Sequence, residues 1–168
     1  MNQYSKGGRD TKISGMRERR RTVDWERAGV LYARVALGAA FLSAVASRFG
    51  LWGKTLDLKH FANFIEYTSE VNSFLPRATI PYVAAVATVC ETALGTLLIL
   101  GLWPRWVSLA SAALLAMFGT AMAISFGLKC PMDYSVFSAS GAAVLLALDT
   151  SWQKNAQSLN RGVGEDSR

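Results

Sequence analysis

Long apolar runs with almost no charge are the feature that most limits how this chain can fold. Four such runs lie at residues 28–47, 80–102, 107–128 and 134–150. A helix of twenty residues is about 30 Å long, which matches the hydrocarbon core of a bilayer. Buried helices of a soluble bundle are the alternative, but they would show a polar face every three to four residues, and the third run offers only Ser, Thr and Gly. We therefore predict an all-α, integral membrane four-helix bundle.

The composition supports this fold class. Charged residues make up 18% of the chain, against about 25% in an average soluble domain. All five tryptophans lie at edges of the predicted spans, where amphipathic rings settle at the level of the lipid headgroups. Two cysteines and one histidine are too few for a disulfide scaffold or a Cys-rich zinc protein. The sequence therefore predicts no metal site and no covalently bound cofactor.

The two polar ends indicate the orientation. Residues 1–27 hold eight of the eighteen basic residues, and we treat them as a basic cytoplasmic arm and residues 153–168 as a polar cytoplasmic tail. With this orientation the cytoplasmic segments carry twelve basic residues and the outer segments five. The positive-inside rule then predicts a cell (inner) membrane protein with both termini in the cytoplasm. We expect the arm to meet anionic membrane lipid, because no soluble nucleic-acid-binding fold follows it.

A cleaved secretory signal is an alternative for the first run. Ala44-Val45-Ala46 resembles a signal-peptidase site, and Arg20-Arg21 resembles a twin-arginine signal. The run is longer than a usual signal core, however, and three more spans follow it, so a first transmembrane helix is favoured. The outer segment after it, residues 48–79, has apolar residues at helical spacing, which predicts a loop helix between the first two spans.

Two charged residues within the spans, Arg34 and Glu91, are the candidate functional residues. A charge at the bilayer centre costs at least ~2.5–3.5 kcal/mol. Glu91 lies at the midpoint of its span, and Arg34 lies about 5 Å to the cytoplasmic side of its own midpoint. We predict that the two side chains face each other inside the bundle, directly or through water. The pair is either a clamp that fixes helix register or a proton or quinone-head-group site.

Small residues on the same helices predict close packing. Gly38 follows Arg34 by one turn and Gly95 follows Glu91 by one turn, so each charged face also permits close backbone approach. Gly119 and Gly141 are the corresponding candidates on the third and fourth spans. The two cysteines, by contrast, fall near mid-membrane and near the outer surface, too far apart for a disulfide.

The patterns around these residues resemble the DoxX family of small four-helix membrane proteins. The resemblance covers residues 28–148 and rests on the first helix, with Arg34 and Gly38, and on the second, which runs from Glu91 through Gly95 to a short turn with Arg105. It implies an accessory or quinone-facing subunit of a membrane oxidoreductase system. Arg34 and Glu91 match the intramembrane polar positions of that family, and the resemblance identifies no catalytic residue.

Two functions of different class remain open at this point. The first is a redox-associated membrane subunit that contacts quinone between its first two helices. An oxidoreductase partner subunit would carry the electrons, since the chain lacks ligands for haem or iron–sulfur clusters. The second is a non-enzymatic scaffold, assembly factor or small transporter, acting as a homo-oligomer, in which the charged pair only organises the bundle. In either case the chain is an accessory protein more than a self-sufficient enzyme.

Overall fold

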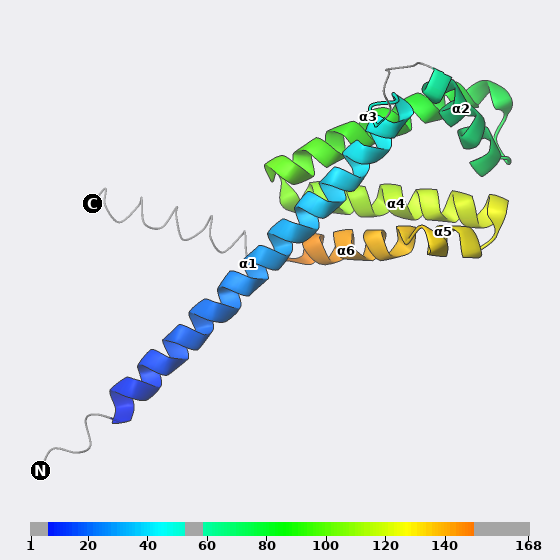
Figure 1. Ribbon diagram of the computed structural model, residues 1–168. Coiled ribbons are helices and arrows are strands. Elements are labelled where there is room, and N and C mark those ends of the chain that lie inside the picture. Colours follow the sequence, from blue (N-terminus) through cyan, green and yellow to red (C-terminus); the bar gives the residue numbers. More distant parts are fainter. Residues whose placement is uncertain (1–6, 53–58, 150–168) are drawn as a thin grey trace, which may run out of the picture. The chain divides into compact units, whose positions relative to one another are not determined.

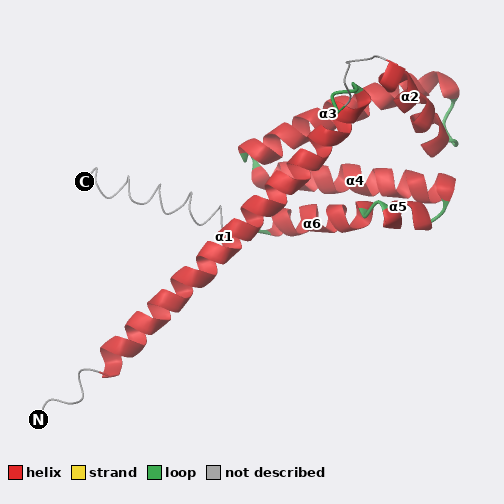
Figure 2. Ribbon diagram, viewed as in Figure 1, coloured by secondary structure: helices red, strands yellow, loops and turns green. Residues whose placement is uncertain are grey.

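The computed structural model describes residues 7–52 and 59–149, with side chains from residue 25 onward, and the regular elements of this part of the chain are all helices. Figures 1 and 2 show the order of elements. They are α1 (Gly7–Arg48), α2 (Lys59–Val71), the 3-10 turn η1 (Arg77–Thr79), α3 (Ile80–Leu100), α4 (Pro104–Phe126), α5 (Lys129–Asp133) and α6 (Val136–Leu148). The predicted all-α class is confirmed.

The chain divides into two compact units. One consists of residues 1–32 and 151–168, of which residues 7–32 are described and form the first part of α1. The basic arm predicted at residues 1–27 is therefore helical from Gly7 onward, while residues 1–6 and the tail at 153–168 lie outside the described residues. The other unit, residues 33–150, contains the rest of α1 and the remaining helices.

Three helical segments are long and apolar enough to cross a membrane: Trp25–Arg48, Arg77–Leu100 and Pro104–Phe126. The chain is therefore a multi-pass membrane protein. The fourth predicted span, residues 134–150, contains the shorter helix α6, whose thirteen residues extend for about 20 Å.

The distribution of polarity in the second unit suits a lipid surrounding. Large apolar side chains point outward along the helices, and the buried interior holds two charged and five hydroxyl side chains beside thirteen apolar residues. A soluble protein would expose fewer large apolar side chains and would almost never bury charged residues fully unless they were paired. The outward set includes Val89, Leu100, Met117, Ile124 and Leu145, and the buried polar set is Arg34, Thr68, Thr88, Glu91, Ser108, Ser111 and Ser140.

Glycines allow α1 and α3 to approach closely. A Cβ atom added to Gly38 would lie 2.8 Å from the carbonyl oxygen of Gly95, and one added to Gly95 would lie 3.0 Å from that of Gly38. A larger residue at either position would push the two backbones apart. This contact fixes how far α1 is shifted along α3, and therefore which side chains of the two helices meet.

The packing of α4 against α6 corrects one prediction. Gly119 lies against the ring of Phe137, which an added Cβ would approach to 2.8 Å, but a Cβ added to Gly141 would meet nothing within 4 Å. The assignment of Gly141 to helix packing is therefore wrong, because that residue faces outward. Its neighbour Ser140 faces α4 instead and donates a hydrogen bond to the carbonyl oxygen of Ala112, at 2.9 Å.

Helix α2 contacts the C-terminal end of α4 through a hydrogen bond and a ring contact. The Ser125 hydroxyl donates a hydrogen bond to the carbonyl oxygen of Val71, at 2.6 Å, and the rings of Tyr67 and Phe126 stack with centroids 6.4 Å apart. Helix α2, which lies between α1 and α3 in the sequence, therefore packs against the C-terminal end of α4.

Candidate functional site

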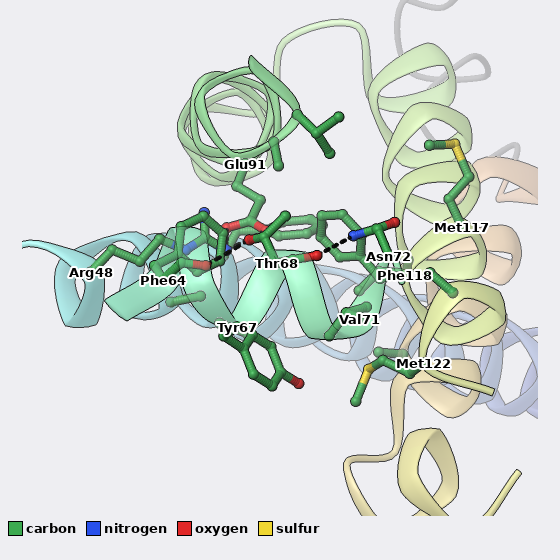
Figure 3. Close-up of a pocket in the computed structure, with 18 of the residues that line it drawn as sticks. Arg48, Phe64, Tyr67, Thr68, Val71, Asn72, Glu91, Met117, Phe118 and Met122 are labelled. Carbon is green, nitrogen blue, oxygen red and sulfur yellow. Dashed lines mark hydrogen bonds and ion pairs between the residues drawn. The ribbon is translucent and has the colours of Figure 1, made fainter. Parts of the chain in front are cut away.

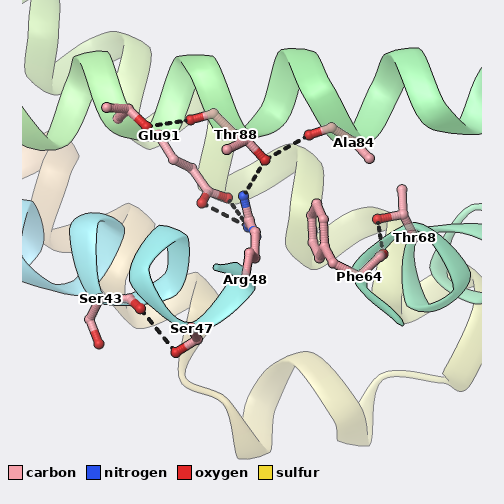
Figure 4. A network of polar contacts seen from close by, with 9 residues as sticks. Ser43, Ser47, Arg48, Phe64, Thr68, Ala84, Thr88 and Glu91 are labelled. Atoms are coloured by element: carbon pink, nitrogen blue, oxygen red, sulfur yellow. Dashed lines mark hydrogen bonds and ion pairs between the residues drawn. The ribbon is translucent and has the colours of Figure 1, made fainter. Parts of the chain in front are cut away.

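An ion pair between Arg48 and Glu91 forms the centre of the site. Glu91 lies halfway along α3 and is only 2% exposed. Arg48, the last residue of α1, donates a hydrogen bond from Nη2 to Glu91 Oε1 at 2.8 Å, and the same nitrogen lies 2.7 Å from Oε2. Its Nη1 atom donates to Thr88 Oγ1 at 3.0 Å, one turn earlier on α3 (Figure 4). The carboxylate charge is therefore neutralised inside the unit.

Helix α2 supplies the third contact of this arginine. The guanidinium carbon of Arg48 lies 3.8 Å from the centroid of the Phe64 ring, a cation–π contact. Phe64 in turn packs against Phe61, whose ring stacks on Phe49 with centroids 5.7 Å apart. Figure 4 shows Arg48 between Glu91 and Phe64. Arg48 therefore connects α1, α2 and α3 at one place.

Arg34 has a different environment. Its Nε and Nη2 atoms both donate to the carbonyl oxygen of Leu98, at 3.1 and 2.9 Å, and the residue is 4% exposed. The last carbonyl groups of a helix lack partners within the helix, and a positive charge there interacts favourably with the helix dipole. Gly101, which ends α3 with φ of 75°, leaves room for the guanidinium, because a Cβ at Gly101 would collide with Arg34 Nη2. Arg34 thus stabilises the C-terminus of α3.

The predicted pairing of Arg34 with Glu91 is therefore wrong: Glu91 pairs with Arg48. The two helices run antiparallel, and the contact of Gly38 with Gly95 places Arg34 beside the last turn of α3. Leu98 is seven residues beyond Glu91, which corresponds to about 10 Å along the helix. The sequence-based prediction placed the midpoints of the two spans at the same depth. The observed shift of α1 along α3 brings Arg34 to Leu98 and leaves Glu91 beyond its reach.

Sequence reasoning missed Arg48 because it assigned that residue to the outer segment. A signal was available, since a carboxylate buried in a span needs a cation and Arg48 lies at the end of the neighbouring span. Arginine side chains are usually expected to reach outward from a helix end toward water. Here the side chain reaches inward, where Glu91, Thr88 and the Phe64 ring hold it.

A cavity of about 340 Å³ opens beside the ion pair, between α1, α2, α3 and α4 (Figure 3). Arg48 and Glu91 belong to its wall, and most of the remaining wall is aliphatic or aromatic. Burial, with smaller contributions from Cys130, Tyr134 and Glu70, raises the pKa of the Tyr67 phenol above its ordinary value of 10.0, so that it is a neutral group at pH 7. The apolar wall includes Leu37, Phe41, Phe64, Leu115, Phe118 and Met122.

Among the residues that the structure describes, no cysteine or histidine lines this cavity. Cys90 and Cys130 are both free thiols and both half-buried. Within residues 7–52 and 59–149, no three His, Cys, Asp or Glu side chains come close enough together to hold a metal ion.

The comparisons with known proteins identify a family. A family model described as methylamine utilisation protein MauE matches residues 26–129, a range that contains α2, α3, α4 and the Arg48–Glu91 pair. This family differs from DoxX, so the assignment to DoxX from the sequence patterns is wrong. Comparison with curated proteins and with solved structures gave no match.

Proposed function

Because the chain belongs to the MauE family, we propose that it is a multi-pass membrane accessory protein of a redox system of the methylamine-utilisation type. The observation that carries this proposal is the extent of the family match, which includes almost all of the three long apolar helices. The whole chain has two cysteines, too few for an iron–sulfur cluster, and its one histidine, His60, lies on α2, outside the long apolar helices. An oxidoreductase partner therefore carries the electrons, and this chain supports it from within the membrane.

The proposed topology has four crossings, with α6 as the fourth and both termini in the cytoplasm of a cell (inner) membrane. The distribution of basic residues supports the orientation, with twelve on the proposed inner side and five on the outer side. Helix α6 is about 20 Å long, so it crosses only with the residues around it or where the bilayer thins. In this orientation α2 covers the outer end of the bundle.

Reporter fusions test this topology. Alkaline phosphatase, which is active only outside the cytoplasm, should be active when fused after Leu128 and inactive when fused after Leu102 or Arg168. A fluorescent protein that folds only in the cytoplasm should give the reverse pattern. Phosphatase activity at the Arg168 fusion would show that α6 does not cross the membrane in this direction.

Complementation tests the function itself. In a bacterium that grows on methylamine, the resident MauE protein is deleted and this chain is expressed in its place. We expect growth on methylamine to return, with growth on succinate as the control for general fitness. Membrane-inserted protein that leaves growth on methylamine at the level of the deletion strain would contradict the proposal.

A further inference from the structure

The cavity beside the Arg48–Glu91 ion pair has the features of a binding site for a small lipid-soluble molecule. Ligand sites are usually apolar concavities of about 300–1,000 Å³ with a few polar groups that fix orientation. The cavity here has a volume of about 340 Å³, more than twice the ~150 Å³ that suffices for benzene. A single substituted ring therefore fits.

The chemistry of the wall indicates what kind of ring. Arg48 and Glu91 neutralise each other, so an ionic ligand would bring an uncompensated charge into an apolar space. A guanidinium carries five N–H donors, and the contacts of Arg48 with Thr88 and Glu91 use only Nη1 and Nη2. A donor that remains is suited to an oxygen acceptor such as a ring carbonyl. The aromatic side chains of Phe41, Phe64 and Phe118 are suited to a flat ring.

The opening of the cavity indicates where the ligand comes from. Met117 lines the cavity and is 65% exposed, so it lies at the opening (Figure 3). This residue is near the middle of α4, Pro104–Phe126, which is long and apolar enough to span the bilayer. The cavity therefore opens toward lipid beside Met117, and a molecule dissolved in the bilayer can reach it there. Methionine is flexible enough to move aside for such a molecule.

We propose that this cavity binds the ring of a lipid-soluble quinone, which enters from the bilayer past Met117 and accepts a hydrogen bond from Arg48. The inference rests on the proposed function for its membrane setting and its redox context. It concerns binding alone: the quinone is bound next to the partner oxidoreductase that reacts with it. The isoprenoid tail of the quinone would remain in the lipid outside the opening.

Quinone binding is measured on the purified full chain in lipid nanodiscs, with decylubiquinone as the probe. Bound quinone is determined over a concentration series after subtraction of the quinone retained by empty nanodiscs. Met117→Trp should block the opening, and Ile124→Trp is the matched control. Ile124 lies on the same helix and is also 65% exposed, but it is not part of the cavity wall. We expect saturable binding that Met117→Trp weakens at least about tenfold and Ile124→Trp leaves unchanged.

A second variant tests the polar contact. Arg48→Lys keeps a positive charge beside Glu91 but removes the planar fork of N–H donors. Binding should weaken about ten- to hundredfold, the usual effect of losing a hydrogen bond to a charged group. Thermal unfolding of each variant shows whether it is folded. If Arg48→Lys does not fold, the comparison of Met117→Trp with Ile124→Trp decides the question.

Three results would overturn the proposal. They are an absence of saturable binding, equal binding to the two tryptophan variants, and competition by decanol as strong as that by the quinone, which would identify a site for acyl chains. The complementation experiment separates this inference from the proposed function. Growth on methylamine with Met117→Trp would support the proposed function and show that this function does not require the quinone site. Saturable quinone binding by a chain that does not restore growth would support the site and contradict the proposed function.

Discussion

Two arginines on the same helix show two ways of keeping a cation inside a membrane protein. Arg34 donates to a backbone carbonyl at the end of α3, whereas Arg48 binds the side chains of Glu91 and Thr88 and the ring of Phe64. The carbonyl of Leu98 is fixed by the helix that contains it. The partners of Arg48 are side chains, and two of them, Glu91 and Phe64, also line the cavity.

The comparison teaches that burial alone does not identify a functional charge. Arg34 and Glu91 are both almost completely buried, yet they belong to different arrangements. The guanidinium of Arg34 completes a helix end, which is a structural task. Arg48 lies in the wall of the cavity, where the proposed ligand would meet its remaining N–H donor. The substitutions below test this difference, beginning with the largest expected effect.

The strongest test removes the cation beside Glu91. Arg48→Met leaves a buried carboxylate without its partner, and we expect the free energy of unfolding in detergent to fall by about 3–5 kcal/mol. Adding Glu91→Gln to this variant should recover most of the loss, because a neutral amide no longer needs a cation. Both values come from denaturant titration followed by circular dichroism.

The control for that experiment uses the other arginine. Glu91→Gln should change the free energy of unfolding of Arg34→Met by the same amount as it changes that of the unsubstituted chain, since residues more than about 7–10 Å apart with no shared partner behave independently. Coupling between Arg34 and Glu91 as large as that between Arg48 and Glu91 would reinstate the pairing expected from the sequence.

The sequence was sufficient to predict the long apolar helices but not which side chains of different helices contact each other. Runs of uncharged residues predict spans because a bilayer excludes charge, and the observed segments from Trp25, Arg77 and Pro104 lie close to those runs. Side-chain partners depend on how far one helix is shifted along another, and one turn of shift changes a contact by about 5.4 Å. The contact of Gly38 with Gly95 sets that shift, and its geometry cannot be obtained from spacing within either helix.

The family assignment failed for a related reason. A charged residue followed one turn later by glycine, as in Arg34 with Gly38, is a packing pattern common to many membrane helices. Such a pattern indicates that two helices approach closely, and it does not distinguish DoxX from MauE. The cavity was also beyond sequence reasoning, because its wall combines residues from α1, α2, α3, α4 and α6.

The next largest effect is expected at the end of α3. Arg34→Met removes both hydrogen bonds to the carbonyl oxygen of Leu98, and the free energy of unfolding should fall by about 1.5–3 kcal/mol. Quinone binding to the folded variant should remain unchanged, because Arg34 does not line the cavity. Loss of binding in a variant that unfolds normally would show that the two arginines act together.

The contact of α1 with α3 should tolerate even a methyl group poorly. In Gly38→Ala the added Cβ meets Ile99 Cγ1 at 2.7 Å and the Gly95 carbonyl oxygen at 2.8 Å, so we expect a loss of about 1–3 kcal/mol in the free energy of unfolding. Gly141→Ala is the matched control, since a Cβ there meets nothing within 4 Å. That substitution should be neutral or slightly stabilising, because alanine favours a helix over glycine. Equal losses for both would mean that the glycines do not set the packing.

The smallest predicted effect isolates the contribution of α2 to the arginine. Phe64→Leu keeps most of the apolar volume but removes the ring 3.8 Å from the Arg48 guanidinium, and it should lower the free energy of unfolding by about 0.5–1 kcal/mol. Part of this loss should disappear in the Arg48→Met background, where no cation faces the ring. Phe74→Leu, at an exposed phenylalanine outside the cavity wall, controls for the general cost of losing a ring. A loss that is the same with and without Arg48 would show that Phe64 acts through packing alone, and α2 would then cover the cavity without holding its arginine.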